Sequence, residues 1–526
     1  MAGGLLNLVS HGQESLLLYG NPQISCFTSS FKRLTNFGMQ KFRVDYEGSR
    51  MLRLDTESKM KFKMPRYADM LYDTYLVMNL PDIWSPLYLT PSGDWIEYGF
   101  KWIEEIGSNI IKEVEVEAGG NVLSRYTGEY FSNIVKRDRN GKKQELWNRM
   151  TGNVPELNDP GNANSRINTY PNAYYTGTTN IRPSIRGRKI YIPLDMWFGR
   201  SSKMAFPLLS LQYQELNIHI TLRSIKELYI IRDVLDVENN HPYVAPNINV
   251  SEHQLWHFLN PPEDPNGTVT IQNSNWNSDI HLISTYIFLD NTEREIFANK
   301  PQSYLIKDVY VWDLPNIAGS DIVEIDSRGL ISSYMFRFRR SDVDLRNTWS
   351  NYTNYPYDTI PYQVTNVGSP DPFLYITGNY TPDSLLQNDK NILLNMALVL
   401  DGKYRENILD QGVYNYIEKY NNTSQGIKDG LYVYSFALNT GNWSIQPSGA
   451  MNMDKFEKIQ FEINTLEPPT DPSAAYVNLC DGNGNIIGTR KNLWDLNEYN
   501  FDLTIFEERY NVVKFESGMV GLQYAR

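Results

Sequence analysis

The 526-residue sequence contains very little cysteine, which limits the redox chemistry and the disulfide frameworks that it can support. Its two cysteines, Cys26 and Cys480, lie too far apart for a CxxC redox pair or a metal knuckle. A large chain also rarely depends on a single disulfide. We therefore expect synthesis in a reducing compartment.

Long apolar runs are also missing, which argues against membrane insertion. No window offers the roughly 18 consecutive apolar residues that a spanning helix needs. The N-terminus has no basic segment before its first leucines, and Ala2 stands where N-myristoylation requires glycine. The sequence predicts neither a secretory signal nor an anchor.

Positive charge is in short supply. Lysine and arginine number 49 against 61 acidic residues, a formal net charge of −12. This balance disfavours binding to the phosphate backbone of a nucleic acid. The longest basic cluster, "KRDRNGKK" at Lys136–Lys143, contains an Asn-Gly pair and is predicted to be a solvated loop.

Motifs of nucleophilic, metal and nucleotide chemistry are absent, since the chain has no HExxH, GxSxG or GxxxxGK[ST]. His253 and His257 are four residues apart but lack a third ligand nearby, so we predict structural or surface roles. Carboxylate pairs such as Asp342 and Asp344 are expected by chance among so many acidic residues. "DGNGN" at Asp481–Asn485 lacks the sixth and twelfth residues of a calcium loop and predicts a turn. We predict no catalytic residue, no metal site and no cofactor.

Apolar and aromatic residues are plentiful, at 41% and 13% of the chain. They are sufficient for sizeable cores, and the length fits two large β domains or three smaller ones. Apolar and polar residues alternate in four segments: Lys59–Met64, Lys112–Tyr126, Glu215–Arg223 and Phe456–Leu466. Gly119-Gly120-Asn121 divides the second of these into a hairpin. One buried and one wet face per strand indicate antiparallel sheets in sandwiches.

Helical signals are few and short. The N-terminal leucines have approximate helical spacing, and Thr292 and Glu295 have the spacing of a capping box. Loop-rich stretches at Asn153–Gly187 and Arg346–Asp383 occupy matching places in two β-rich halves. These features favour a duplicated sandwich, with a linker at residues 226–250.

Five blocks of the sequence are distinctive when taken together. The first pairs "MAGGLLNLV" with "GNPQISCFTSSFKRLTNFGMQ", and the second is "RKIYIPLDMWFGRSSKMAFPLLSLQYQELNIHI". The others are "TYIFLDNTEREIFA", "FRFRRSDVDLRNTWSNYTNYP" and "YSFALNTGNWSIQPSGAMNMDKF". These blocks resemble the major capsid proteins of nucleocytoplasmic large DNA viruses. They follow the order of that family across nearly the whole chain, although Ser25-Cys26 stands where the family usually has a Thr-Phe pair.

The resemblance implies an all-β fold of two tandem eight-stranded antiparallel jelly rolls, with short connective helices and long surface loops. We expect an N-terminal base segment at residues 1–25, a first jelly roll at 26–225, a linker at 226–250 and a second jelly roll at 251–526. "TYIFLDNTEREIFA" is expected to open the second jelly roll. Residues around Gly199–Ser202 are expected to reverse the chain beneath the sandwich, so that 214–222 return as a core strand.

The resemblance also implies a structural protein whose homotrimers tile an icosahedral shell. Its partners would be further copies of itself, neighbouring capsomers, minor capsid and penton proteins, and an inner membrane at the capsomer base. The protein would be made in the host cytoplasm and reside in the virion capsid. Residues of the matching blocks expected to support folding and assembly are Asn21, Pro22, Arg33, Thr35, Asn36, Phe37, Pro193, Trp197, Phe198, Pro207, Gln212, Tyr213, Glu215, Asp290, Arg294, Phe297, Arg346, Trp349, Pro447, Ser448 and Gly449.

Two alternatives remain open at the level of sequence. One is a carbohydrate-binding jelly roll, in which tyrosines of "YPNAYYTG" at Tyr170–Gly177 stack on sugars. The other is a double jelly-roll scaffold that assists assembly but is absent from the virion. Sequons that are candidates for glycosylation occur at Asn266, Asn351, Asn379, Asn421 and Asn442.

Overall fold

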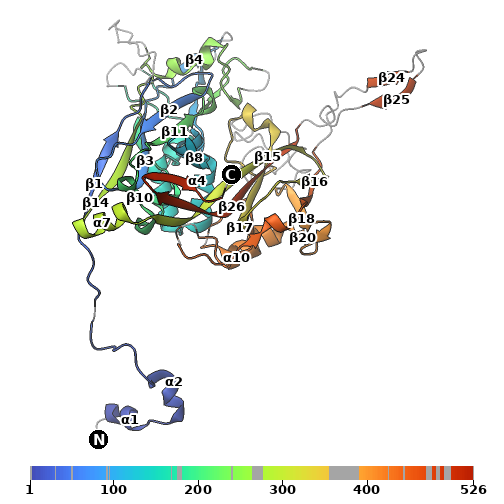
Figure 1. The fold of residues 1–526 in the computed structure, drawn as a ribbon. Helices are drawn as coiled ribbons and strands as arrows, with labels where there is room; N and C mark the ends of the chain where they lie inside the picture. The colour runs from blue at the N-terminus through green and yellow to red at the C-terminus, as the bar shows by residue number, and fades with distance from the viewer. Residues whose placement is uncertain are drawn as a thin grey trace.

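The computed structural model describes most of the chain. The described residues are 3–29, 31–48, 51–90, 93, 95–167, 169–174, 181–237, 241–262, 276–354, 390–424, 426–441, 443, 445–468, 477–480, 486–490 and 499–524. Two β-sandwiches lie side by side, and a narrow N-terminal arm leads away from them (Figure 1).

The first sandwich faces a five-stranded sheet against a four-stranded one, and all their pairings are antiparallel. The larger sheet has the order β1 (Phe37–Val44), β14 (His281–Leu289), β3 (Met70–Leu80) and β10 (Phe206–Pro207), and β9 (Arg188–Pro193) also pairs with β3. The smaller has the order β2 (Ser58–Lys63), β11 (Leu216–Leu222), β7 (Ile111–Ala118) and β8 (Asn121–Tyr126).

The predicted boundary between the two jelly rolls is wrong. Within residues 226–250, expected to be a linker, strands β12 (Tyr229–Arg232) and β13 (Tyr243–Val244) form a sheet with β6 (Phe100–Trp102). Strand β14, expected to open the second jelly roll, lies between β1 and β3 of the first. Sequence spacing could not show this, because strand partners far apart in the chain leave no local signal. A hairpin of β4 (Leu87–Leu89) and β5 (Trp95–Glu97) completes this half.

The second sandwich is built in the same way from a six-stranded and a five-stranded antiparallel sheet. The first has the order β15 (Gln302–Ile317), β26 (Phe501–Glu516), β17 (Leu330–Arg340) and β21 (Leu431–Ser435), with β22 (Met451–Asn452) on β17 and β27 (Met519–Leu522) on β26. The second has the order β16 (Ser320–Glu324), β23 (Ile459–Thr465), β18 (Leu393–Leu400) and β19 (Lys403–Tyr404), with β20 (Leu409–Asp410) on β18. A hairpin of β24 (Val477–Cys480) and β25 (Ile486–Arg490) projects from the body (Figure 1).

The strands that alternate in sequence alternate in burial, as predicted. Along β23, the apolar residues Ile459, Phe461 and Ile463 are buried and their polar neighbours are half-exposed. The hairpin between β7 and β8 is also confirmed, and Gly119 and Gly120 take the positive φ angles of 58° and 86° that glycine tolerates best.

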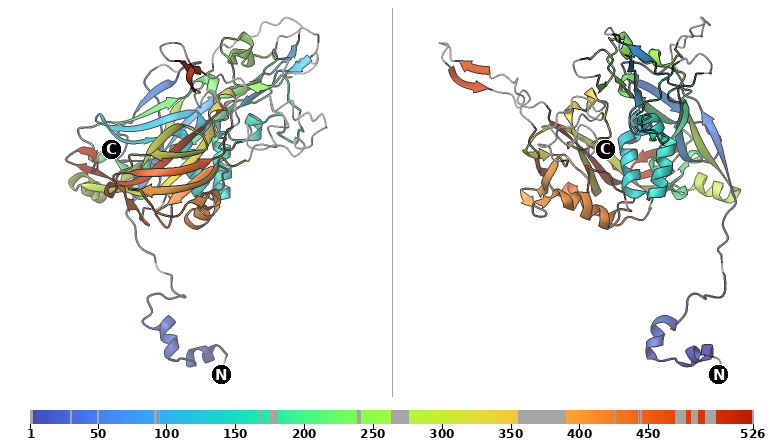
Figure 2. Two further views of the ribbon diagram at one scale, coloured as in Figure 1. Left: turned by 90° about the vertical axis from the view of Figure 1, so that its right-hand side faces the viewer. Right: turned by 180° about the vertical axis from the view of Figure 1, so that it is seen from behind.

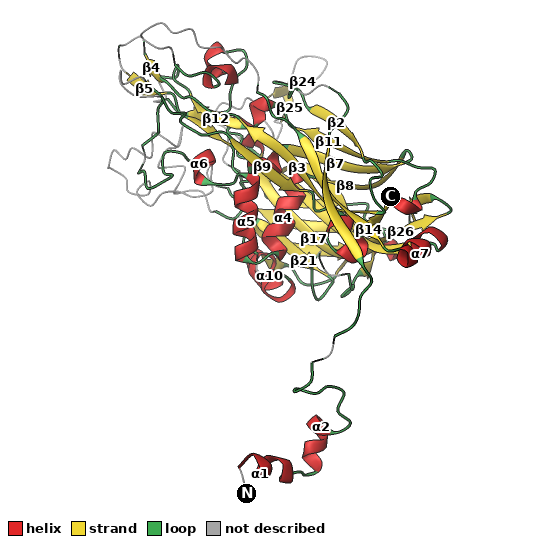
Figure 3. Cartoon of the chain, turned by 90° about the vertical axis from the view of Figure 1, so that its left-hand side faces the viewer, coloured by secondary structure: helices red, strands yellow, loops and turns green. Residues whose placement is uncertain are grey.

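Two helices of eleven residues each were missed by the sequence analysis. These are α4 (Gly128–Asp138) and α5 (Gly141–Thr151), which lie beside each other and flank the sheets (Figure 3). Thr127 and Asn140 cap them by accepting hydrogen bonds from the backbone N–H groups of Tyr130 and Lys143. Shorter helices are α3 (Ile106–Asn109), α6 (Pro155–Asn158) and α10 (Glu418–Asn422).

The predicted helix near residue 291 is present as α7 (Asn291–Asn299), but it does not begin with the predicted capping box. Asp290 occupies the N-cap position and its side chain makes no capping hydrogen bond. Instead, Arg294 in the second turn pairs with the buried Asp69 at 2.9 Å. The helix is therefore held to β14 and β3 by tertiary contacts more than by its cap.

The N-terminal arm carries α1 (Gly3–Val9) and α2 (Leu16–Tyr19), and neither has a buried residue. Figure 2 shows both helices standing well clear of the sandwiches from two directions. The apolar side chains along the arm are exposed: Leu5, Leu6, Leu8, Val9, Leu16, Leu17, Leu18, Ile24, Phe27, Phe31 and Leu34. Such a row of apolar side chains suits contact with something outside the chain.

Candidate functional site

The boundary between the two sandwiches contains buried charged side chains. We call this boundary the seam; helix α4 of the first sandwich forms one side of it, and strands β17 and β26 of the second form the other. Apolar contacts also cross it, since the rings of Tyr130 and Phe506 lie 5.9 Å apart. One hydrophobic core extends through the first sandwich and includes Phe506 and Phe515 of the second.

Arg137 of α4 and Glu508 of β26 form the centre of the seam. Their side chains have no exposed surface, and the guanidinium donates two hydrogen bonds to the carboxylate at 2.9 and 3.2 Å. Tyr130 and Ser333 donate two more, at 2.8 and 2.7 Å. Burial alone raises the pKa of Glu508, but Arg137 and Lys307 outweigh it and hold the pKa well below its usual range. Glu508 is therefore a carboxylate at neutral pH.

Asp138 completes this arrangement on the helix side. It accepts two hydrogen bonds from Arg137, at 3.0 and 2.8 Å, and one from the hydroxyl of Thr440 at 2.9 Å. The Thr440 carbonyl in turn accepts from Lys307 at 3.0 Å. Buried charges whose hydrogen-bonding groups are matched in this way fix one relative position of the parts that carry them.

A second ion pair joins the same elements nearer the surface. Arg337 of β17 donates from Nε and Nη2 to both oxygens of Glu129 in α4, at 2.5 and 3.0 Å. Burial raises the pKa of Glu129, yet the charge of Arg337 outweighs it and lowers the pKa overall. Two parallel hydrogen bonds set direction as well as distance, so this pair orients α4 against β17.

The prediction that Lys136–Lys143 is a solvated loop is wrong. Its first three residues end α4, and Asn140 is the N-cap of α5, which begins at Gly141. Arg139 stacks on the ring of Trp443 at 3.5 Å, while Lys142 and Lys143 are exposed as expected. The apolar residues Tyr130, Phe131, Ile134 and Val135 carried a helical signal that the charges of the cluster obscured.

The loop after β17 crosses the seam from the other direction. Trp349 donates from its indole nitrogen to the Glu227 carbonyl of the first half at 3.0 Å, and the guanidiniums of Arg223 and Arg339 lie 4.5 and 5.4 Å from its ring. Arg346 instead pairs with Asp342 of its own loop at 3.1 Å. Of these two predicted residues, Trp349 connects the halves and Arg346 shapes the loop.

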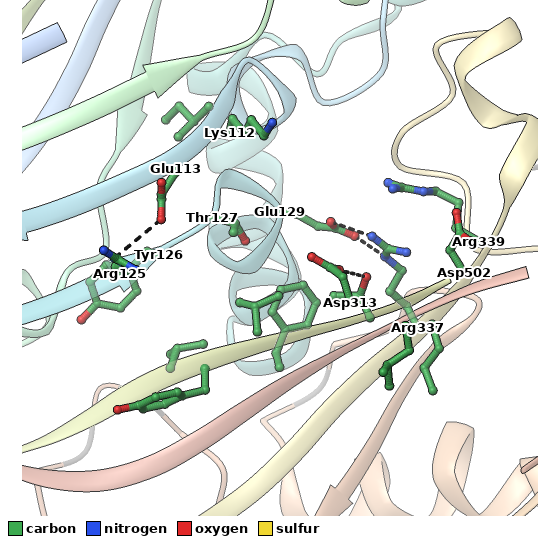
Figure 4. Close-up of a pocket in the computed structure, with 18 of the residues that line it drawn as sticks. Lys112, Glu113, Arg125, Tyr126, Thr127, Glu129, Asp313, Arg337, Arg339 and Asp502 are labelled. Atoms are coloured by element: carbon green, nitrogen blue, oxygen red, sulfur yellow. Dashed lines mark hydrogen bonds and ion pairs between the residues drawn. The ribbon is translucent and has the colours of Figure 1, made fainter. Parts of the chain in front are cut away.

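An open cleft of about 1060 Å³ runs along the seam between β7, β8 and α4 on one side and β15, β17 and β26 on the other. Figure 4 shows Glu129, Arg337 and Arg339 at one end and Glu113 with Arg125 at the other. Basic and acidic side chains alternate around the cleft, so its charge is nearly balanced. Its lining includes the hydroxyl of Thr504, which donates to the Asp313 carboxylate at 2.6 Å.

Groups that could bind a metal are not found in the described ranges. No cluster of three or more His, Cys, Asp or Glu side chains occurs there. His253 accepts a backbone hydrogen bond from Asn247 at 3.2 Å, and His257 stacks on Trp256 at 3.6 Å. Over the same ranges, no helix has the length and apolar character needed to cross a bilayer.

The aromatic stretch before β11 packs into the core as predicted. Trp197 and Phe198 are fully buried, and the chain reverses through two 3-10 turns at Trp197–Gly199 and Ser202–Met204. Phe206 of β10 packs edge-to-face on Phe515 of the second sandwich at 5.0 Å. The aromatic stretch thus packs against the second sandwich and helps to join the two halves.

The other predicted residues divide by exposure. Pro207 is buried; Pro193, Phe297, Ser448 and Gly449 are half-buried; and Asn21, Pro22, Arg33, Thr35, Asn36, Phe37, Gln212, Tyr213, Glu215, Asp290, Arg294 and Pro447 are exposed. Several have defined contacts. Thr35 donates to Glu293 at 2.7 Å, and the backbone N–H groups of Gln212 and Tyr213 both donate to the Gly518 carbonyl.

One expected glycosylation site and one expected sugar-stacking residue are buried. Asn351 is buried, so this sequon cannot accept a glycan in the folded chain; Asn421 is exposed, and Asn266, Asn379 and Asn442 lie outside the described residues. Tyr170 is also buried, and its hydroxyl donates to the Phe100 carbonyl at 2.8 Å, so it cannot stack on a sugar.

Comparison with known proteins gives consistent matches over the whole chain. The family model described as "Major capsid protein N-terminus" matches residues 25–290, and the one described as "Large eukaryotic DNA virus major capsid protein" matches residues 293–521. The border between them falls directly after β14, where strand pairing also divides the sandwiches.

Individual relatives are distant in sequence but similar in length. The major capsid proteins of Paramecium bursaria Chlorella virus 1 and Phaeocystis pouchetii virus are each 23% identical, with all of both chains covered. Among solved structures, the PBCV-1 virus capsid model aligns with a TM-score of 0.63 at 19% identity, covering 95% of this chain and 100% of that one. The Faustovirus major capsid protein gives 0.61 at 14% identity, covering 94% and 93%. The shared fold is the double jelly roll.

Proposed function

The chain belongs to the major capsid protein family of large eukaryotic DNA viruses, and from this we propose that three copies form a capsomer of the viral shell. One observation carries the proposal: the fully buried pair of Arg137 and Glu508 joins the two jelly rolls of a chain into a single body. A closed ring of three such two-lobed chains would place six similar lobes around one axis. The resulting outline approximates a hexagon, which can tile an icosahedral shell.

Exposed apolar surface on the second jelly roll supports contacts between copies. Tyr416, Ile417 and Tyr420, in and beside α10, have exposed fractions of 60%, 52% and 89%. Large aromatic side chains at this level of exposure are typical of surfaces that become buried on association. We propose that this face contributes to contacts within or between capsomers.

The N-terminal arm supports a second set of partners. Its exposed leucines lie beyond the folded body, at the end where α1 and α2 are seen in Figure 1. We propose that the arm marks the inner base of the capsomer and contacts minor capsid proteins or an inner membrane, while penton proteins meet the capsomer at the vertices. The chain would be synthesised in the host cytoplasm before entering the shell.

Light scattering on the purified full-length chain tests the trimer. A mass near three times 60.9 kDa that persists on dilution is the expected result. The Arg337→Met and Tyr420→Ser variants provide an internal comparison, because the first acts at the seam and the second on the exposed face. Loss of the trimer in Tyr420→Ser alone would locate the contact, whereas a strict monomer for the unaltered chain under all conditions would contradict self-assembly.

A further inference from the structure

A hollow of about 560 Å³ lies at one end of the first jelly roll and is unlike the cleft at the seam. Its walls come from the α6 loop and from the segment that leads into β9. The charged residues around it are Glu156, Arg166, Arg182, Arg186 and Arg188. Four cations against one anion give the hollow a positive charge on a chain whose net charge is −12.

The arginines of the hollow are free to bind a ligand. Arg182, Arg186 and Arg188 are exposed, and none of them forms an ion pair or side-chain hydrogen bond with the described residues. Arg166 donates only to the Pro160 carbonyl, at 3.3 Å. The Lys136–Lys143 cluster differs in this respect, because its arginines already contact Asp138, Glu508 and Trp443.

The backbone that carries these arginines is fixed. Ile83 and Ile185 exchange two hydrogen bonds, at 2.9 and 3.2 Å, and Asp82 accepts from the Gly187 N–H at 2.6 Å. A side chain at Gly187 would meet the Leu80 carbonyl oxygen at 2.9 Å, so only glycine permits this close approach. Arg186 and Arg188 therefore project from an anchored segment, which reduces the ordering that a ligand must impose.

The hollow lies at the end of the body that is distant from the N-terminal arm. Its wall element α6 lies with β4 and β5 at the end of the body away from the N-terminal arm (Figure 3). If the arm marks the inner base of the capsomer, as proposed above, this end faces outward. An outward basic hollow would meet anionic groups on the surface of a host cell.

We propose that this hollow binds a sulfated glycan. Guanidinium groups match the paired oxygens of sulfate geometrically and stay charged at all relevant pH values. The Asn172 side-chain oxygen lies buried at the wall without a hydrogen-bond partner in the described part of the chain, and a sugar hydroxyl would satisfy it. The volume falls within the ~300–1,000 Å³ typical of small-ligand sites, which suits a few sugar units rather than the long basic groove of a nucleic-acid path.

Calorimetric titration of the full chain with a heparin-derived hexasaccharide tests this assignment. The same hexasaccharide after chemical desulfation is the ligand control, and single-stranded DNA of equal charge is the alternative polyanion. The test variant is R182Q/R186Q and its matched control is K142Q/K143Q, because both remove two exposed positive charges. Loss of a charge-assisted hydrogen bond should weaken binding by about tenfold or more in the test variant.

Binding of the sulfated sugar that is lost on desulfation, weakened in R182Q/R186Q and unchanged in K142Q/K143Q would support the site. Equal weakening in both variants would show non-specific attraction and overturn it. Absence of binding at millimolar sugar would overturn it as well. If the DNA bound as tightly as the sugar and with the same dependence on Arg182 and Arg186, the hollow would be assigned to nucleic acid instead of to a sulfated glycan. The orientation of the capsomer does not enter these measurements, so failure of the trimer proposal would leave them valid.

Discussion

Replacing Arg137 by methionine tests whether buried charges hold the two jelly rolls together. The substitution keeps a long apolar side chain but removes the guanidinium that donates to Glu508 and Asp138. Both carboxylate side chains lack exposed surface, so water cannot replace the lost donor. Removing one partner of a buried ion pair typically costs about 3–5 kcal/mol, and we expect R137M to lower the free energy of unfolding by that amount.

The effect of this substitution should also depend on pH. Burial raises the pKa of Glu508, and Arg137 and Lys307 reverse that effect and lower it. A carboxylate with a lowered pKa in the folded state stabilises the fold above its unfolded pKa, about 4.3 for glutamate, and this stabilisation declines as the pH falls below it. The difference in stability between the unaltered chain and R137M should therefore be full at pH 7 and shrink below about pH 4.

Urea unfolding of the full chain, followed by tryptophan fluorescence, measures this difference. The matched control is R149M, because Arg149 pairs with Glu145 on the neighbouring α5 while both remain about two-thirds exposed, at 66% and 64%. An exposed pair contributes roughly 0–1 kcal/mol. If R137M cost no more than R149M, the buried pair would not be what joins the two halves, and the reasoning would be refuted.

Three further predictions use other parts of the structure. W349A should lose about 2–3 kcal/mol through its contacts at the seam, whereas W95A, which removes an exposed tryptophan, should change stability by less than about 0.5 kcal/mol; equal costs in urea unfolding would contradict the role of Trp349. Burial raises the pKa of Asp195 to about 6, so the fold loses stability as the pH rises from the unfolded aspartate value of about 3.9 to about 6. D195N should therefore be more stabilising at pH 8 than at pH 5 when urea unfolding midpoints are compared at the two pH values. Deleting residues 3–29 should leave the unfolding midpoint unchanged, because no side chain there is buried; a lower midpoint would reveal contacts between the arm and the body.

Local patterns were sufficient to predict a few of the strands. The alternation in β2, β7, β11 and β23 is a property of consecutive residues, and the structure buries the apolar face of each. The aromatic turn at Trp197 and Phe198 was likewise predicted from its neighbours together with the family resemblance. Sequence reasoning is strongest where one face of an element must be apolar.

Features that depend on distant partners were not predictable in this way. A cluster of lysine and arginine is normally solvated, and Arg137 departs from that rule only because Glu508 lies opposite it, 371 positions later in the chain. The domain boundary was misplaced for a related reason, since the sequence of β14 does not reveal that its partners are β1 and β3. The exposed arginines before β9 were not predicted to form a site, because the sequence does not show which basic side chains lack ion pairs.

The pairing of β1 with β14 has a consequence for the order in which the protein can be made. Residues 37–44 receive their partner strand only after residue 289 has been synthesised, so the first jelly roll cannot close while the ribosome is still in the first half of the message. Arg137 acquires its partner carboxylate later still, once Glu508 has been synthesised. A chain released early would therefore display a half-formed sheet, and Arg137 without Glu508, at the surface where the second lobe should dock. Synthesis of Glu508 is thus a condition for a closed seam, and a chain released before that residue keeps an unfinished fold.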